Sequence, residues 1–186
     1  MSPLILGIMA SSRLASTNSY ESIATAVGTG SSGVITFSVI PGTYKHLQVR
    51  AIVRNTSTGT GEQSVLVTAN GDTGANYATH RLTGNGSAAG AQSYTSGTAI
   101  VPYFNSSNGN AASIYGVYVW DILDYANTSK NKTFRLLGGS DFNGSGTVGL
   151  ISGAWFNTNA ITSLTFTSGG GNWTTATQYA LYGIKG

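Results

Sequence analysis

Charged side chains are nearly missing from this chain, and that shortage limits which folds it can adopt. Only 8% of its 186 residues are Asp, Glu, Lys or Arg, against about 25% in a typical soluble domain. Long surface helices need such residues on their solvent-facing side, so this composition disfavours them. Ser, Thr, Asn and 26 Gly fill the polar positions instead, and these residues are typical of strands joined by tight turns. The composition therefore predicts an all-β protein.

Disorder is the competing interpretation of a chain rich in Gly, Ser and Asn. Disordered segments lack aromatic and β-branched residues, whereas ten Tyr, six Phe and three Trp are spread along this chain. The length suits one domain that can bury a real core. The sequence has no cysteine, which excludes disulfides, thiolate catalysis and Cys-ligated zinc. We therefore expect a folded domain that is stabilised by packing or by association with other chains.

Short apolar runs recur along the chain and predict about ten strands. The run 113–125 is apolar on both faces, with Tyr118, Trp120 and Ile122 together on one of them. A strand with two apolar faces lies in the centre of a sheet or at an interface, so we expect these three residues to form a subunit interface. The predicted strands are 20–27, 33–40, 45–54, 62–69, 78–82, 98–104, 113–125, 133–137, 147–156, 160–167 and 178–184.

Residues 20–186 show neither a linker nor a repeat of fixed period, so they predict a single domain. Many short strands in one domain favour a two-sheet antiparallel β-sandwich of jelly-roll type. Polar stretches such as 84–97 and 168–172 predict loops at the ends of the sandwich, where binding sites commonly lie.

Residues 1–19 are expected to form an extended apolar arm rather than a targeting segment. They have no positively charged region before the apolar run, which is also short for a signal peptide. No segment of the chain approaches the roughly 20 apolar residues of a membrane span. The arm would dock on a partner such as a capsid protein or a neighbouring subunit, and the alternative is a first strand of the domain's own sheet. Its apolar residues are Leu4, Ile5, Leu6, Ile8 and Met9.

The residues that usually carry catalysis are few and scattered. Asp121 and Asp124 are three apart on a predicted strand and point to opposite faces, so they cannot act as the paired carboxylates of a glycosidase. His46 and His80 lack both a nucleophile elbow and metal-ligand spacing. The sequence therefore predicts a protein that is not an enzyme and that holds no cofactor or metal. A hydrolase acting on polysaccharide is kept as the least favoured of the three functions considered for this chain.

Basic residues are also dispersed, although the net charge is +3. Only Lys130, Lys132 and Arg135 come close together, beside a predicted turn. Nucleic-acid-binding proteins concentrate such residues on one face, so we expect a solvated turn, with phosphate contact as the alternative, and no nucleic-acid partner.

The segment 70–77, with the sequence NGDTGANY, is the most distinctive turn signal in the chain. It lacks the acid count and spacing of a calcium loop. We expect a structural turn, with Asp72, Asn76 and Tyr77 as candidates for a surface contact.

Several motifs then occur in an order that resembles one group of proteins. They are YESIAT at 20–25, ITFS at 35–38, IPGTYKHLQVR at 40–50, NGDTGANY at 70–77, WFNT at 155–158 before AITSL at 160–164, and ALYGIKG at 180–186. Together they resemble virion structural proteins of tailed phages, particularly phages of cyanobacteria and marine bacteria. The resemblance spans about residues 20–186, implies a component of the phage particle and brings no catalytic residues with it.

The resemblance and the lack of chemistry lead to two expected functions. The first is a capsid decoration, or cement, protein that forms a homotrimer on the outer shell, binds the major capsid protein and stabilises the head. The alternative is a tail fibre or receptor-binding component that contacts host surface glycans through the loops 84–97 and 168–172. In that case Tyr94, Tyr103 and Trp173 would stack on sugar rings. The expected location is the surface of the particle, with the head favoured over the tail.

Overall fold

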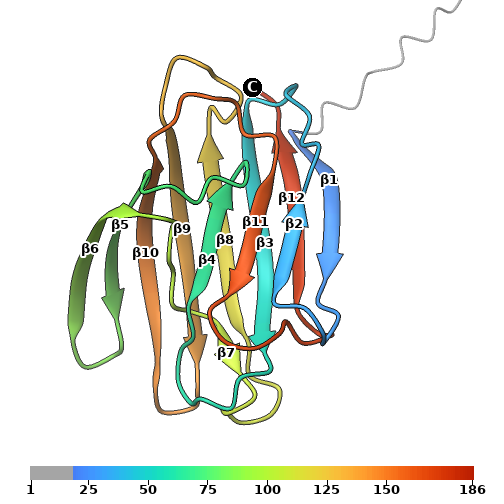
Figure 1. Cartoon of the computed structure of the whole chain (residues 1–186). Helices are drawn as coiled ribbons and strands as arrows, with labels where there is room; N and C mark the ends of the chain where they lie inside the picture. Colours follow the sequence, from blue (N-terminus) through green and yellow to red (C-terminus); the bar gives the residue numbers. More distant parts are fainter. Residues whose placement is uncertain (1–18) are drawn as a thin grey trace, which may run out of the picture.

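Two antiparallel β-sheets packed face to face form the structure, a computed structural model that describes residues 19–186 (Figure 1). The described residues contain no helix, and hence none that is long and apolar enough to cross a membrane. The arm predicted at Leu4, Ile5, Leu6, Ile8 and Met9 lies outside the described residues. The strands are β1 (Tyr20–Val27), β2 (Val34–Phe37), β3 (His46–Asn55), β4 (Val65–Ala69), β5 (Tyr77–Gly84), β6 (Ala89–Gly97), β7 (Ser106–Ser107), β8 (Gly116–Leu123), β9 (Lys132–Asp141), β10 (Gly146–Trp155), β11 (Leu164–Ser168) and β12 (Gln178–Ile184).

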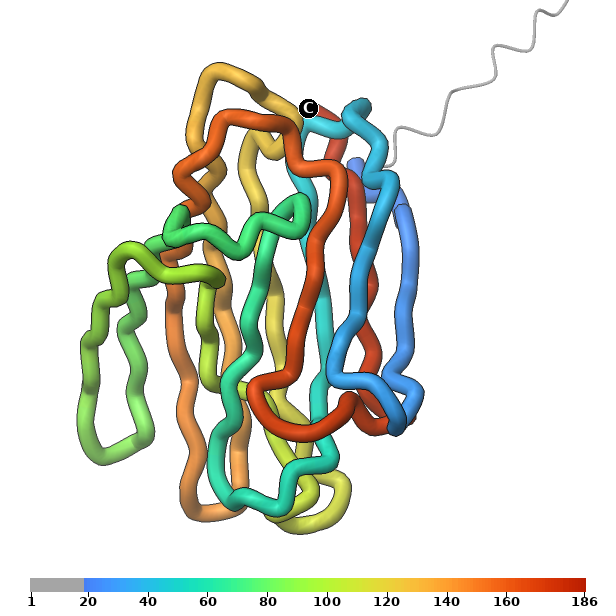
Figure 2. Tube along the Cα trace, in the orientation of Figure 1, coloured from blue at the N-terminus to red at the C-terminus, as the bar shows by residue number. Residues whose placement is uncertain are grey.

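The two sheets are very unequal in size. The large sheet has nine strands, in the order β1-β12-β3-β8-β9-β10-β5-β6 with β7 beside β3, and the small sheet has the order β2-β11-β4. The all-β class and the packing of two antiparallel sheets are confirmed. The jelly-roll topology is not confirmed by this strand order. The β5–β6 hairpin stands beyond the side of the small sheet (Figure 2).

One predicted loop is a strand. We expected a loop over 84–97, but Ala89–Gly97 forms β6 and pairs with β5. Almost every residue of β6 is exposed, on both faces of the hairpin. Because neither face is buried, the sequence of β6 carries no apolar alternation.

One predicted strand is only partly regular. The segment 98–104 runs beside β4 and bonds to it through Ile100, whose N–H and carbonyl both pair with Val67. Pro102 lies within this segment and has no N–H to donate, although its carbonyl accepts from Val65 N at 2.9 Å. The segment therefore extends the small sheet without forming a continuous strand.

The face expected to form a subunit interface is the core of the chain itself. Tyr118, Trp120 and Ile122 are 1–2% exposed, so the prediction of an interface there is wrong. The Trp120 ring packs edge-on against Phe166 of β11, with ring centroids 6.2 Å apart. The small sheet thus covers this face, and the outward side chains of β8 are on its opposite face.

Two buried cations hold loops at the sheet ends. The Arg54 guanidinium donates to the carbonyls of Asn110, Ala111 and Ile114 at 3.1, 2.9 and 2.7 Å, and its Nε donates to the Asn108 side chain at 3.0 Å. Arg54 is only 7% exposed, because the segment 108–114 folds over it. This contact orients the chain that enters β8.

Lys132 plays the same part at the opposite end of the sheet. Its Nζ donates to the carbonyls of Asn127, Lys130 and Thr158 at 2.7, 2.8 and 2.9 Å. Burial lowers the pKa of Lys132, since removal from water disfavours the charged ammonium. Three carbonyl partners match the three donors of an ammonium group, so Lys132 joins two loops instead of facing solvent.

Candidate functional site

The outward face of the large sheet carries large apolar side chains that the small sheet does not cover. They align across neighbouring strands, since Val119 is opposite Leu137, Leu137 opposite Leu150, and Leu150 opposite Leu82. Each is between 37% and 60% exposed. We call the set the apolar band, and its members are Ile52, Leu82, Val117, Val119, Leu137, Val148 and Leu150.

The band exists because several strands are apolar on both faces. In β9 and β10, Leu136 and Ile151 point into the core and are 2–3% exposed, while Leu137 and Leu150 next to them point outward. Successive residues of a strand face opposite sides, so a pair of adjacent large apolar residues must expose one of them. A contiguous exposed apolar patch commonly marks an interaction surface.

An open hollow of about 900 Å³ lies over the band. Its floor includes Leu82, Val119, Leu137 and Leu150, and Ala91 of β6 lines it as well. Both strands of the β5–β6 hairpin thus contribute to the hollow.

A polar row flanks the band on one side. Asp121 accepts from Gln48 Nε2 at 2.8 Å, and Arg135 donates to Ser152 Oγ at 2.6 Å. His80 continues this row, directly opposite Ser152. The side chains of the row are bonded mainly to one another. On β3 the exposed Arg50 is directly opposite Val119, so polar side chains border the band, whose own members are all apolar.

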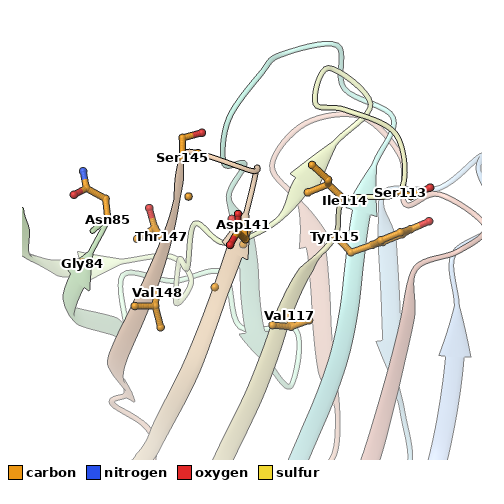
Figure 3. A pocket seen from close by; sticks show the side chains of 14 residues that line it. Gly84, Asn85, Ser113, Ile114, Tyr115, Val117, Asp141, Ser145, Thr147 and Val148 are labelled. Atoms are coloured by element: carbon orange, nitrogen blue, oxygen red, sulfur yellow. The ribbon is translucent and has the colours of Figure 1, made fainter. Parts of the chain in front are cut away.

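A second hollow, of about 730 Å³, lies where loops meet at one end of the large sheet (Figure 3). Asn85, Tyr115, Asp141, Ser145 and Thr147 are among the residues that line it (Figure 3). Hydroxyl, amide and carboxylate groups beside one aromatic ring suit a hydroxylated ligand. The hollow contains a single carboxylate, so it lacks the second one that a glycosidase requires. We call it the loop-end hollow.

The segment 70–77 is a structural turn, and its side chains are used within the chain. The Asp72 carboxylate accepts from Trp155 Nε1, Asn76 Nδ2 and Gly74 N at 2.7, 2.9 and 2.8 Å. These bonds, led by that of Trp155, lower the pKa of Asp72. Tyr77 is fully buried and donates to the Asp72 carbonyl at 2.9 Å, so the expectation of Tyr77 as a surface contact is wrong.

The three aromatic residues expected to stack on sugars do not form one site. Trp173 is fully buried and packs against Tyr179 with ring centroids 5.6 Å apart, so it is unavailable to a ligand. Tyr94 and Tyr103 both lie against the Arg81 guanidinium, with ring centroids 6.0 and 4.6 Å from its carbon. They remain accessible, but on the inward side of the β5–β6 hairpin.

The basic residues near the turn at 127–131 separate in space. Lys130 pairs with Asp124 at 2.9 Å, Lys132 is buried, and Arg135 lies on the outward face of β9. Hydrogen bonds from Lys130 and Lys45 lower the pKa of Asp124 to about 2. These groups therefore form no common basic patch for phosphate.

The two histidines lie on different strands, β3 and β5. His46 Nδ1 accepts from Asp124 N at 3.0 Å, and His80 lies in the polar row beside the band. Within residues 19–186, no three His, Asp or Glu side chains come together in a way that could hold a metal ion.

Sequence reasoning missed the apolar band and the role of Arg54. The adjacent apolar pairs Leu136-Leu137 and Leu150-Ile151 predict strands, and they also indicate that one residue of each pair is exposed. We used only the first of these two indications. Arg54 lies on the same face of β3 as Gln48 and Arg50, and nothing in the sequence indicates that a loop would cover it. Comparisons with protein-family models, with curated proteins and with solved structures found no match for this chain.

Proposed function

We propose that this chain is a non-enzymatic structural protein of a tailed-phage particle, a decoration protein that assembles as a homotrimer on the outer shell of the head. The apolar band is the observation that supports an assembly role. It exposes seven large apolar side chains across five strands. The polar row beside it, where Asp121 is opposite Arg135, bonds to side chains of the same chain. The assignment to a phage particle is supported by the order of motifs that resembles phage virion proteins. We also propose that the sandwich is of jelly-roll type.

The major capsid protein and further copies of the chain are the proposed partners. In this role the arm at residues 4–9 reaches the capsid protein or a neighbouring trimer. Trimers of sandwiches bury apolar strand faces between chains, and obligate interfaces of this kind resemble a domain core.

A particle-binding assay tests the proposal. Purified protein is added to particles that lack it, and bound copies are counted with the wild type, with Leu137→Asp in the band, and with Thr36→Asp on the opposite side of the molecule. We expect the wild type and Thr36→Asp to bind at high copy number and Leu137→Asp to bind poorly while remaining folded. Absence of wild-type binding to heads would refute the proposal.

The loop-end hollow supports one alternative, a tail component that binds host surface glycans. Asp141, Asn85 and Tyr115 offer it hydrogen bonds and a ring face, the usual groups of a sugar site. Glycan-array binding that is lost in Tyr115→Ala and Asp141→Asn would favour this function. No array binding, together with free protein that does not block adsorption, would exclude it.

A further inference from the structure

We propose that the apolar band is the docking site for residues 4–9 of this chain, the segment Leu4-Ile5-Leu6-Gly7-Ile8-Met9, supplied by the same or a neighbouring copy. The inference deepens the proposed function and rests on its assembly role for the arm. The proposed function leaves the partner of the arm open between the capsid protein and a neighbouring trimer. This inference assigns the arm to one surface, the apolar band.

The shape of the band favours a linear segment over a second sheet. The band crosses the five strands β3, β8, β9, β10 and β5, in that order, which is about 19 Å at the usual strand spacing. Along the strands it is only two outward residues deep, as Val117 and Val119 show on β8, or about 7 Å. Sheet-on-sheet packing would need a broad apolar face, whereas one extended segment fits a narrow strip.

The length and chemistry of the segment match this strip. Six extended residues span about 20 Å, close to the width of the five strands. Residues 4–9 carry no charge and no side-chain hydrogen-bond donor, and the band has no polar side chain to satisfy one. The polar row of Asp121, Arg135 and Ser152 bounds the band on one side, which would keep an apolar segment in place.

The position of the described chain permits this contact. It begins at Ser19, next to the edge strand β1, which lies two strands from Ile52 of β3. Those two steps amount to about 10 Å across the strands. Tyr20 is level with Ile184 and His46, so the six residues from His46 to Ile52 add about 20 Å along the strands. The direct distance is then about 22 Å, and the ten residues 10–19 can span about 33 Å when extended. The segment can therefore reach the band of its own copy or that of an adjacent one.

Cysteine cross-linking tests the inference directly, because the sequence has no cysteine. Residue 5 lies four residues, about 13 Å, beyond residue 9, and β10 lies three strands, about 14 Å, beyond β3. The full-length double variant Ile5→Cys with Leu150→Cys is therefore oxidised and compared with Ile5→Cys with Thr36→Cys. Thr36 is exposed on the small sheet, so the second pair is a matched control on the opposite face. We expect a disulfide in the band pair and at least about tenfold less in the control pair.

The size of the product shows which copy supplies the segment. A monomer of altered gel mobility indicates the same copy, and a product of twice the mass that needs both cysteines indicates a neighbouring copy. Either product supports the inference. Equal cross-linking of the two pairs, or none in the band pair, overturns it. So does efficient dimer formation by Leu150→Cys alone, because the band would then face the band of a second copy.

A charge placed in the band provides a second readout. In the pair Leu4→Cys with Leu82→Cys, which joins the far end of the segment to β5, adding Leu150→Asp should lower the disulfide yield about tenfold, because an unpaired carboxylate would be covered. Adding Thr36→Asp should leave it unchanged. These measurements use free protein, so they stand even if the chain fails to bind particles, and particle binding without cross-linking would refute only this inference.

Discussion

Replacement of the buried guanidinium of Arg54 should unfold one loop and destabilise the whole domain. Arg54→Met keeps much of the apolar stem but removes the donors to three carbonyls in 110–114 and to the Asn108 side chain. Hydrogen bonds to charged groups contribute about 1.5–3 kcal/mol each. Replacing the buried charge also removes its desolvation cost, which offsets part of this loss. The carbonyls at 110–114 that lose their donor lie close enough to the surface to bind water, which reduces the loss further.

These opposing terms lead us to expect a loss of about 2–4 kcal/mol in the free energy of unfolding. For a domain of this size that corresponds to a fall in Tm of roughly 4–16 °C. Urea denaturation with an unchanged m-value would measure it. Hydrogen exchange should show faster exchange over 108–115, the segment that also supplies Tyr115 to the loop-end hollow.

Arg50→Met is the matched control on the same strand. Arg50 is exposed and lies over the rings of Tyr20 and Tyr182, contacts worth about 0.5–1 kcal/mol at exposed sites. If Arg54→Met changes stability no more than Arg50→Met does, and exchange over 108–115 is unaffected, the reasoning about the buried guanidinium is wrong.

Two further predictions concern backbone packing and acid stability. Gly116→Ala should destabilise by about 1–3 kcal/mol, because a Cβ there would lie 1.6 Å from the Phe104 carbonyl oxygen. Gly42→Ala, where a Cβ meets no atom within 4 Å, should stay within about 0.5 kcal/mol of the wild type in the same melt, and equal effects would contradict the packing. The pKa of Asp124 is about 2 in the folded state against 3.8 normally, so its stabilising contribution is present above pH 4 and is lost as the pH falls from about 4 to 2. Lys130→Met should raise the pKa of Asp124 toward 3.8 in an NMR carboxyl titration, and an unchanged pKa would show that the ion pair is not formed.

The alternation of apolar residues made most of the fold predictable. The bounds of β1 and β12 agree with the predicted runs 20–27 and 178–184. In β12 the buried Tyr179 and Leu181 alternate with more exposed residues, whereas β1 has a bulge between Ser22 and Ala24 and no fully buried residue. β6, in contrast, was missed. A hairpin strand that is solvated on both faces leaves no periodic signal, and its pairing depends on β5 rather than on burial.

Which face of a strand is buried was harder to predict than the strand itself. The sequence shows Tyr118 and Trp120 on one face of β8 and Val117 and Val119 on the other, without indicating which the small sheet covers. The aromatic face packs inward against β11, so the smaller β-branched residues are exposed. The three-stranded sheet packs on one face of the nine-stranded sheet and leaves the other face uncovered. The apolar band therefore lies on the uncovered face.

The turn at 70–77 could be predicted from its local sequence, but the contacts of its side chains could not. Its Asn-Gly pair correctly predicts a turn, and Asn70 and Gly71 both have positive φ, at 53° and 67°. The partner that fixes Asp72, however, is Trp155 from β10. A contact between residues so distant in sequence cannot be predicted from either segment alone.

The most direct test of the proposed role is to locate the protein on an intact phage particle. A tag at the exposed residue Gly42, in the β2–β3 connection, leaves the apolar band and the loop-end hollow untouched. Gold labelling or cryo-electron microscopy of the tagged particle would then count and place the copies. We predict many copies distributed over the head surface in groups of three. Labelling confined to the tail in a few copies, or absent from the particle, would contradict the proposal.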